Sequence, residues 1–198
     1  MPGLGLGLSS LQVQLLAGHL AYLERWNAKL NLVAAASPEM WARRHSLDSL
    51  AVAGWVPAGG DVVDVGSGAG FPGIPLAILG IAKRVVLLEP RQNRAAFLQN
   101  VVAGLGLNRV EVRCRRAEAE AERFDLVVGR AVAKPDAWAS LASRICNSAG
   151  RFAFFSQSEP APELGTGLML EVRRYLLPSE PERWVGLYVP RGTEGTKP

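Results

Sequence analysis

Residues 62–77 have the sequence VVDVGSGAGFPGIPLA, in which a short apolar segment leads into a glycine-rich turn and then into a helix-forming run. The apolar segment VVDV at 62–65 is typical of a buried strand. Glycine in the turn lets the backbone adopt positive φ and approach a ligand closely, although tight strand-to-helix turns also use glycine without binding anything. The segment therefore predicts an α/β fold and a candidate nucleotide site at this turn.

The rest of the chain repeats this alternation of short apolar segments with amphipathic ones. Strands that are apolar almost throughout, each followed by a helix, predict a parallel sheet covered on both faces. LMLEVRRYLL at 168–177 and RWVGLYV at 183–189 predict a terminal antiparallel hairpin, which makes a mostly parallel sheet of seven strands. The predicted strands before the hairpin are 62–65, 84–89, 110–114, one within 124–131, and 151–155, and the predicted helices are 72–79, 91–105 and 135–146.

A helical layer is predicted ahead of the sheet. After Ser9 and Ser10, either of which is able to cap a helix, apolar residues recur at steps of three and four from Leu11 through Trp26 to Leu30. Ser37-Pro38-Glu39 begins a second helix that is predicted to run to about Ala53. We expect one domain over 1–198, with a flexible tail at 1–8, the helical layer at 9–54, a cofactor-binding core at 61–155, a loop at 156–167, the hairpin at 168–189 and a tail at 190–198.

The composition is that of a globular protein with a mildly basic surface. The chain is 48% hydrophobic and 20% charged, which excludes a largely disordered protein. A net charge of +4 permits a polyanionic partner without requiring one. Most of the 22 basic residues are arginine, which suits phosphate and base contacts, but a GC-rich genome would account for them equally well.

The sequence predicts a cytoplasmic, monomeric protein without a membrane segment or a metal site. No stretch approaches the roughly 20 apolar residues of a membrane span, and the N-terminus lacks the basic start and apolar run of a signal peptide. The two cysteines, Cys114 and Cys146, cannot build a zinc site. We expect both to be buried free thiols, as in a reducing compartment.

The glycine spacing separates two kinds of nucleotide ligand. A dinucleotide turn needs Gly-x-Gly-x-x-Gly, but here Phe71 occupies the third position and the pattern is Gly66-x-Gly68-x-Gly70. This arrangement resembles the first motif of class I methyltransferases, whose ligand, S-adenosylmethionine, has no pyrophosphate. Asp64 just before the turn is suited to pair with the cationic amino acid end of that ligand.

Further candidates follow the other predicted strands. Glu89 ends the second strand, where its carboxylate can accept hydrogen bonds from both ribose hydroxyls of NAD or of S-adenosylmethionine. Ala117 and Glu118 follow the third strand, where this fold places an adenine-contacting loop, and Arg130 follows the fourth. Each of these charges alone fits a solvated surface residue as well, but together with the glycine turn they form a consistent site.

Three segments carry a more specific likeness: WNAKLNLVAAASPEMWARRHSLDSLAV at 26–52, DVGSGAGFPGIPLA at 64–77 and FDLVVGRAVA at 124–133. In them the chain resembles the bacterial small-subunit ribosomal RNA guanine-N7 methyltransferases, also called the glucose-inhibited division protein B family. The pattern Asn27-x-x-x-Asn31-Leu32 and the run His45-Ser46-Leu47-Asp48-Ser49 go beyond a generic methyltransferase turn. The chain departs from the family at Glu89-Pro90, where Asp-Ser is more usual and basic residues follow as Arg91 and Arg94, and at AFFSQ (153–157), which replaces a continuation toward Ala-Leu-Lys-Gly.

The resemblance implies a class I, Rossmann-like methyltransferase that uses S-adenosylmethionine to methylate N7 of a guanine in 16S ribosomal RNA or the small ribosomal subunit. It implies a substrate rim that holds the target base close to the methyl group, formed by Asn31, Arg44, His45 and Asp48. The cofactor contacts that it implies are Gly66, Phe71, Ala117, Glu118 and Arg130, supported by Asp64, Gly68 and Glu89.

Guanine N7 carries a lone pair and no proton, so in-line methyl transfer requires positioning and no obligatory general base. We therefore expect His45 and Asp48 to orient the base or the structure rather than to transfer a proton. Trp26 and Trp41 are expected in the core of the helical layer. RNA contacts, for which the alternative is plain surface charge, are expected from Arg43, Arg44, Arg91, Arg94, Arg115 and Arg116, with Arg173 and Arg174 as further candidates.

Two other functions remain open from the sequence. A small-molecule methyltransferase on this fold would need a closed apolar pocket, whereas an RNA enzyme should have an open, basic crevice. A non-catalytic RNA-binding or assembly protein would have no use for the glycine turn, Glu89 and Arg130 together.

Overall fold

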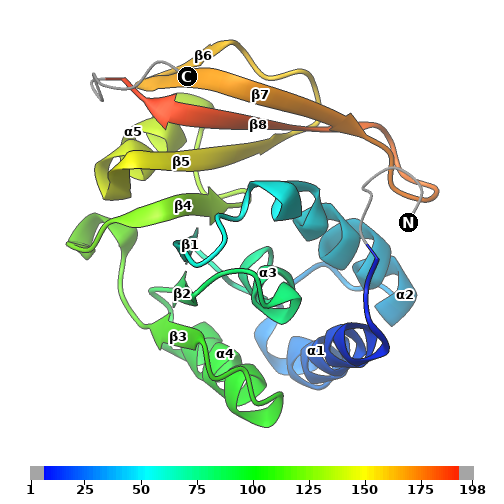
Figure 1. The fold of residues 1–198 in the computed structure, drawn as a ribbon. Coiled ribbons are helices and arrows are strands. Elements are labelled where there is room, and N and C mark those ends of the chain that lie inside the picture. Colours follow the sequence, from blue (N-terminus) through cyan, green and yellow to red (C-terminus); the bar gives the residue numbers. More distant parts are fainter. Residues whose placement is uncertain (1–6, 192–198) are drawn as a thin grey trace.

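The computed structural model describes residues 7–191, and one eight-stranded sheet runs through them (Figure 1). Its strand order is β3-β2-β1-β4-β5-β8-β7-β6. The pairs from β3 to β5 are parallel, and the pairs from β5 to β6 are antiparallel. The order reverses beside β1, where open α/β sheets bind ligands. The strands are β1 (Asp61–Val65), β2 (Arg84–Leu88), β3 (Val110–Arg113), β4 (Phe124–Gly129), β5 (Cys146–Ser156), β6 (Glu163–Leu164), β7 (Gly167–Tyr175) and β8 (Arg183–Pro190).

Helices pack on both faces of this sheet. One apolar cluster joins α1 (Ser10–Leu30), α3 (Gly73–Leu79) and α4 (Gln92–Gly104) to one face, and a second joins α5 (Pro135–Ile145) to the other. Helix α1 begins with a capping box, in which the Gln12 N–H donates to Ser9 Oγ and the Ser9 N–H donates to Gln12 Oε1. The α/β fold predicted from the sequence is confirmed, and the predicted bounds of β1, β2 and β3 differ from the observed ones by one residue at most.

The predicted loop at 156–167 is wrong in part, because it contains β6. The two residues of β6 pair with the start of β7 across the two-residue turn Gly165-Thr166, and Gly165 has a φ of +52°. A glycine with positive φ is what a tight hairpin turn requires. The sheet therefore has eight strands instead of seven.

The second predicted helix is also corrected. The helical segment is not one regular helix to Ala53 but three successive pieces: α2 (Pro38–Trp41), a π-helix at Ala42–Leu47 and a 3₁₀-helix at Leu50–Trp55. The Ser49 hydroxyl donates to the His45 carbonyl oxygen at 2.6 Å, a side-chain contact that competes with regular α-helical hydrogen bonding. The change of winding places His45 inside the π-helix, a conformation that often accompanies functional sites.

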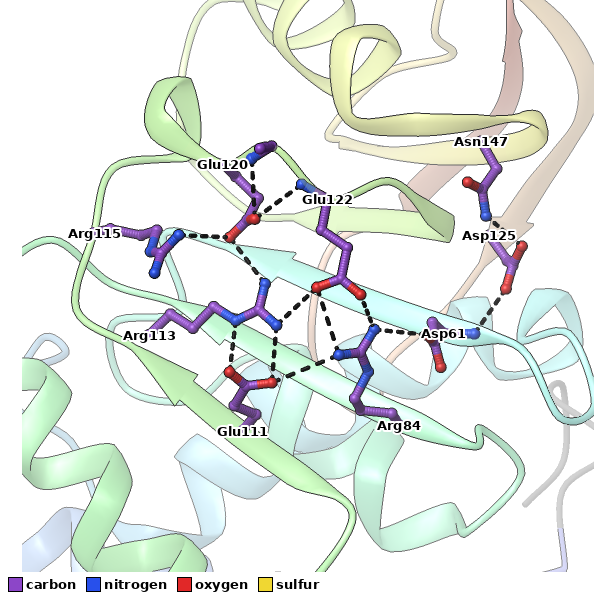
Figure 2. A network of polar contacts seen from close by, with 10 residues as sticks. Asp61, Arg84, Glu111, Arg113, Arg115, Glu120, Glu122, Asp125 and Asn147 are labelled. Atoms are coloured by element: carbon purple, nitrogen blue, oxygen red, sulfur yellow. Dashed lines mark hydrogen bonds and ion pairs between the residues drawn. The ribbon is translucent and has the colours of Figure 1, made fainter.

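The sheet is not covered by helices on both faces along its whole width. Between β3 and β4 the chain forms only the short 3₁₀-helix Ala117–Ala119. Over β2 and β3, on the face that α5 occupies farther along, charged side chains take the place of a helix (Figure 2). We call this group the β3 ion-pair network; it consists of Asp61, Arg84, Glu111, Arg113, Glu120 and Glu122.

Arg113 is the centre of the β3 ion-pair network. Its guanidinium contacts Glu111 at 2.7 Å, Glu120 at 3.0 Å and Glu122 at 2.8 Å, and its side chain is 13% exposed. Glu120 is buried, so its carboxylate depends on these contacts more than a surface carboxylate would. The network therefore covers the part of β2 and β3 that no helix covers, and its ion pairs neutralise the charges that lie beside the apolar core.

Replacing Arg113 with leucine is expected to lower the free energy of unfolding at pH 7 by about 2 kcal/mol, because the buried Glu120 loses the guanidinium that donates to it at 3.0 Å. Hydrogen bonds from Arg113 lower the pKa of Glu111, and those from Arg84 and Arg113 lower the pKa of Glu122. The stabilisation from these contacts is fully present above the pKa that the two glutamates have in the unfolded chain. It is lost as the pH falls through their lower pKa values in the folded protein. Urea unfolding should therefore find a smaller difference between variant and wild type at pH 3 than at pH 7.

Arg115→Leu is the matched control. Arg115 lies 3.8 Å from Glu120 and its side chain is 49% exposed, so its loss should cost under about 0.5 kcal/mol. Equal losses for the two variants would contradict the role given to Arg113.

The two cysteines differ from each other. Cys146 at the start of β5 is buried as predicted, and burial raises the pKa of its thiol to about 12. Cys114 is exposed, which corrects the prediction: it follows the last residue of β3 and lies outside the apolar core. Within residues 7–191, no helix has the length and apolarity to cross a membrane, and no group of three or more His, Cys, Asp or Glu side chains is placed to hold a metal ion.

Candidate active site

The glycine turn after β1 has the shape that its sequence predicts. Gly66, Gly68 and Gly70 have φ values of +66°, +53° and +90°, which residues with a Cβ rarely adopt. The N–H groups of Gly66 and Ser67 both donate to the Leu88 carbonyl oxygen at the end of β2, at 2.8 and 3.1 Å. The turn is thereby fixed to the neighbouring strand at the reversal point of the sheet.

Asp64 lies beneath this turn and is fully buried. Its Oδ2 accepts a hydrogen bond from the Gly73 N–H at 3.0 Å, whereas its Oδ1 has no partner among the described residues. A Cβ at position 73 would fall 2.7 Å from Oδ2, so glycine is required for this approach. Burial raises the pKa of Asp64 to about 7, while the Gly73 hydrogen bond and the Arg130 cation act in the opposite direction. The free oxygen is therefore a site for a cationic or hydrogen-bond-donating group.

Glu89, just after β2, is 3% exposed and faces the same turn. Its Oε2 accepts from the Gly68 N–H at 3.0 Å, and its Oε1 accepts from the Arg91 N–H at 2.9 Å. Each oxygen can accept a second hydrogen bond, so the carboxylate is held in place and still able to bind hydroxyl groups.

Phe71 links the turn to both helical pieces of the N-terminal layer. Its ring centroid lies 4.8 Å from that of His19 on α1 and 5.2 Å from that of His45 in the π-helix. The Arg130 guanidinium is 5.7 Å from the Phe71 centroid. His19, to which the sequence assigns no partner, is fully buried, and its Nε2 lies 2.8 Å from the Ala69 carbonyl oxygen. His19 thus supports the turn from below, and burial lowers its pKa to about 4.

Arg130, just after β4, forms the centre of a cluster of polar side chains with Arg44, His45, Asp48 and Tyr175, which we call the polar group. Its Nη1 donates to Asp48 Oδ2 at 2.6 Å and to the Arg44 carbonyl oxygen at 3.2 Å, and its Nη2 lies 2.7 Å from His45 Nδ1. Asp48 Oδ1 accepts from the Tyr175 hydroxyl at 2.6 Å. Sequence reasoning missed Tyr175, which is 127 positions from Asp48 and comes from the C-terminal strand β7.

A cavity of about 400 Å³ opens beside this polar group. Its wall combines three arginines with aromatic side chains, so it is basic and suited to a planar ligand. The lining residues that the polar group contributes are Arg44, His45, Asp48, Arg130 and Tyr175; the others are Ala131, Phe155, Ser156, Gln157 and Arg183.

The turn after β3 is anchored from α5. Ala117 is buried and Glu118 is exposed. The Arg144 guanidinium donates to the Glu120 carbonyl oxygen at 3.1 Å and to that of Ala117. The segment predicted to contact an adenine is therefore held by two elements, α5 and the β3 ion-pair network.

These features agree with the comparison to known families. The family model described as "GidB: rRNA small subunit methyltransferase G" matches residues 12–167. The chain belongs to this family. The resemblance inferred from the motifs at 26–52, 64–77 and 124–133 is thereby confirmed.

Individual relatives of the methyltransferase G family extend the match to most of the chain. The protein named ribosomal RNA small subunit methyltransferase G from Roseiflexus sp. (strain RS-1) is 38% identical over 167 residues, which cover 81% of this chain and 71% of that one. The protein named ribosomal RNA small subunit methyltransferase G 1 from Syntrophobacter fumaroxidans is 36% identical over 202 residues, covering 96% of this chain and 89% of that one.

Solved structures share the fold at low sequence identity. M. jannaschii TYW2, solved in complex with AdoMet, has a TM-score of 0.57 at 16% identity, covering 77% of this chain and 78% of that one. The B. subtilis M1A22 tRNA methyltransferase TrmK has a TM-score of 0.55 at 14% identity, covering 77% and 69%. At these identities the likeness concerns the fold alone.

The residues of the 26–52 segment that characterise the family have local roles as well. The Asn27 side chain makes two hydrogen bonds with the backbone of Val33, at 3.1 and 3.0 Å. Asn31 is the C-cap of α1, with a φ of +47°, and does not line the 400 Å³ cavity. Trp41 is buried and its indole N–H donates to the Ala34 carbonyl oxygen, while Trp26 is half-buried against Phe97, as expected of core residues.

Three of the predicted RNA-binding arginines line two separate cavities. Arg91 and Arg94 lie with Lys29 around a hollow of about 460 Å³. Arg44 lines the other cavity and pairs with Glu180 at 2.5 Å, and the neighbouring Arg43 is half-buried. The remaining candidates are Arg115 beside Glu120, Arg116 exposed, Arg173 over the Trp55 ring and paired with Glu171, and Arg174 paired with Glu182.

Proposed function

We propose that this chain transfers the methyl group of S-adenosylmethionine to N7 of a guanine in 16S ribosomal RNA. The observation that carries the proposal is the junction of two sites at Phe71 and Arg130. On one side lies the glycine turn with Asp64 and Glu89, and on the other lies the basic cavity. Membership of the rRNA small subunit methyltransferase G family supports both the reaction and the substrate.

The residues present fit S-adenosylmethionine. The unpartnered Oδ1 of Asp64 suits an ammonium group, and the free acceptor capacity of Glu89 suits ribose hydroxyls. When bound, the cofactor supplies a methyl group on a positively charged sulfur. In this proposal the cofactor is held by Asp64, Gly66, Gly68, Phe71, Glu89, Ala117, Glu118 and Arg130.

The side chains near the target base position it and do not remove a proton from it. Guanine N7 is an acceptor with a free lone pair, so nothing has to be deprotonated before attack. His45 Nδ1 and both oxygens of Asp48 are already engaged, the former with Arg130 and the latter with Arg130 and Tyr175. Positioning of the target base is then the contribution of His45, Asp48 and Arg44 at the rim.

RNA would be bound through the arginines that flank the turn. The cavity beside Arg130 is open and basic, which favours RNA over a small apolar substrate. Arg91 and Arg94 with Lys29 lie around the second hollow, where an RNA backbone could pass. Arg43, Arg44, Arg115 and Arg116 would extend this surface.

The test is methyl transfer from labelled S-adenosylmethionine to small-subunit RNA taken from a strain that lacks its own enzyme, with the product mapped to a nucleotide. Label at N7 of a single guanine is the expected result. Cofactor binding without label on this RNA would leave the cofactor assignment in place and exclude the RNA substrate. A free-RNA preparation and intact small subunits, tested side by side, identify which of them is the substrate.

Replacing Tyr175 with phenylalanine should slow methyl transfer about tenfold, because Asp48 loses one of its two partners and no longer fixes Arg130. Tyr188→Phe is the matched control. The Tyr188 hydroxyl donates to the Ala161 carbonyl oxygen at 2.8 Å, in the apolar cluster on the α5 face of the sheet. Both variants should lose about 1 kcal/mol of stability, but only Tyr175→Phe should lower the rate in single-turnover assays. Equal rates for the two variants would contradict the role given to Tyr175 in positioning Asp48.

A further inference from the structure

The contact between Arg130 and His45 fixes the protonation state of the histidine. Arg130 Nη2 lies 2.7 Å from His45 Nδ1. A guanidinium has only donors, so Nδ1 has to be the acceptor and cannot carry a hydrogen. His45 is therefore neutral, with its one ring hydrogen on Nε2. Burial lowers the pKa of His45 to about 4; the Arg130 cation acts in the same direction, and Asp48 and a backbone hydrogen bond with Arg44 oppose it, so the ring is neutral at pH 7.

The Nε2–H group of His45 is the part of this polar group that remains for a ligand. His45 is half-buried and lines the 400 Å³ cavity. Among the described residues, the side-chain partner of the His45 ring is Arg130, at Nδ1, whereas Arg130, Asp48 and Tyr175 satisfy one another. The ring is held from the other side by Phe71, at a centroid distance of 5.2 Å. A donor of fixed position thus faces the space where the proposed function places the target base.

We propose that the Nε2–H of His45 donates a hydrogen bond to O6 of the target purine and thereby selects guanine over adenine. The inference rests on the proposed function. In guanine the acceptor O6 lies next to N7, whereas in adenine the same position carries the donor N6–H₂. A donor beside the methylated nitrogen therefore accepts guanine and opposes adenine. Since Nδ1 is blocked by Arg130, His45 cannot present an acceptor at Nε2 by changing its tautomer.

The arrangement also explains what the polar group contributes to specificity. Asp48 orients Arg130 through the 2.6 Å contact, and Arg130 sets the tautomer of His45. Tyr175 in turn holds Asp48 from β7. His45 is the specificity-determining residue in this chain of contacts, and the other three are positioning residues.

The experiment pairs a change in the protein with the removal of O6 from the target base. RNA in which 2-aminopurine replaces the mapped guanine keeps N7 and the 2-amino group but lacks O6 and the hydrogen on N1. The wild-type protein is expected to methylate the guanine RNA about 10- to 100-fold faster than the 2-aminopurine RNA. His45→Phe keeps a ring against Phe71 but has no donor, so the ratio of the two rates should fall to about one-tenth or less of the wild-type ratio. The intrinsic reactivity of N7 in the two bases cancels when the ratios are compared.

His45→Gln provides the rescue, because its side-chain amide can place an N–H near the position of Nε2, and it should recover part of the guanine preference. Tyr188→Phe, remote from the cavity, should keep the wild-type ratio. Cofactor affinity, measured by calorimetry, is expected to stay within about threefold of wild type in the His45 variants. An unchanged ratio in His45→Phe would overturn the inference while leaving the proposed function intact. Absence of N7-methylguanine with the wild-type protein would overturn the proposed function itself, and the inference with it.

Discussion

Arg130→Ala is expected to reduce kcat/KM for methyl transfer by about 100- to 1000-fold, the size of effect seen when one preorganised donor is removed from an active site. The loss has two physical causes. Asp48 is buried and would keep its carboxylate with only the Tyr175 hydroxyl as a partner. His45 would lose the donor that sets its tautomer.

Single-turnover assays with saturating RNA, combined with the Kd for S-adenosylmethionine, separate the effect of Arg130 on the rate of methyl transfer from its effect on cofactor binding. Its ring contact with Phe71 at 5.7 Å predicts a rise in Kd, but one below about tenfold, since a partly exposed cation–π contact is worth about 1 kcal/mol. Most of the loss should therefore appear in the rate. Arg130→Lys should fall between alanine and wild type, because an ammonium can pair with Asp48 but lacks the fork that reaches Asp48 and His45 together.

Arg44→Ala is the control for the loss of a positive charge from the same cavity. The Arg44 side chain is 47% exposed and pairs with Glu180, and only its backbone carbonyl contacts Arg130. We expect less than a tenfold loss, mainly in RNA affinity and larger at low salt. If Arg44→Ala and Arg130→Ala lost the same activity, general electrostatic attraction would account for both, and the fixed geometry around Arg130 would not matter.

The parts of the site that sequence reasoning predicted are those that depend on neighbours along the chain. The glycines at 66, 68 and 70 lie directly after β1, and Asp64 is one position from the end of that strand. The point at which a strand ends and the conformational freedom of glycine both depend on residues close in the sequence, so the sequence pattern was sufficient to predict this turn. The position of Glu89 beside the turn also follows from the sequence, because the parallel register of β1 and β2 aligns the ends of the two strands.

The parts that were missed depend on contacts between distant segments or on a departure from regular winding. Nothing near Tyr175 in the sequence indicates that its hydroxyl reaches Asp48, since β7 first has to pair with β8, and β8 with β5. The Ser37-Pro38-Glu39 start predicts a helix but does not reveal the widened turn of the π-helix at Ala42–Leu47. The strand at 110–114 was predicted within a sheet covered by helices on both faces, and nothing near Glu111 and Arg113 in the sequence indicates that their ion pairs would cover the sheet in place of a helix.

Asp64→Asn is expected to have opposite effects on stability and on cofactor binding. The pKa of the carboxyl is raised from 3.8 to about 7, chiefly by burial. The folded protein therefore binds the proton more tightly than the unfolded chain, and stability falls as the pH rises from about 4 toward 7. Asparagine keeps an acceptor for the Gly73 N–H and removes the buried charge, so the cofactor-free variant should be more stable than wild type at pH 8.

The expected gain is about 2 kcal/mol. A shift of about three pKa units corresponds to roughly 4 kcal/mol, from which the cost of burying an amide N–H₂ without an acceptor is subtracted. Urea unfolding of the cofactor-free proteins between pH 4.5 and 8 should show the two stability curves crossing, because the cost of the buried charge disappears toward acid whereas the cost of the buried amide does not. The same substitution at the other end of β1, Asp61→Asn, removes a charge that pairs with Arg84 at 2.6 Å and should destabilise the protein slightly instead.

The opposite sign is expected for S-adenosylmethionine, because the charge that destabilises the cofactor-free protein is the charge that would pair with the ammonium group. Asp64→Asn should weaken binding at pH 8 by about tenfold or more, the worth of a hydrogen bond to a charged group. In the wild type, binding has to compete with the proton on Asp64, so affinity should fall toward acid by up to about tenfold per pH unit below pH 7. The variant should lose this pH dependence. A variant with wild-type affinity, or with reduced stability at pH 8, would show that Asp64 serves the fold and not the cofactor.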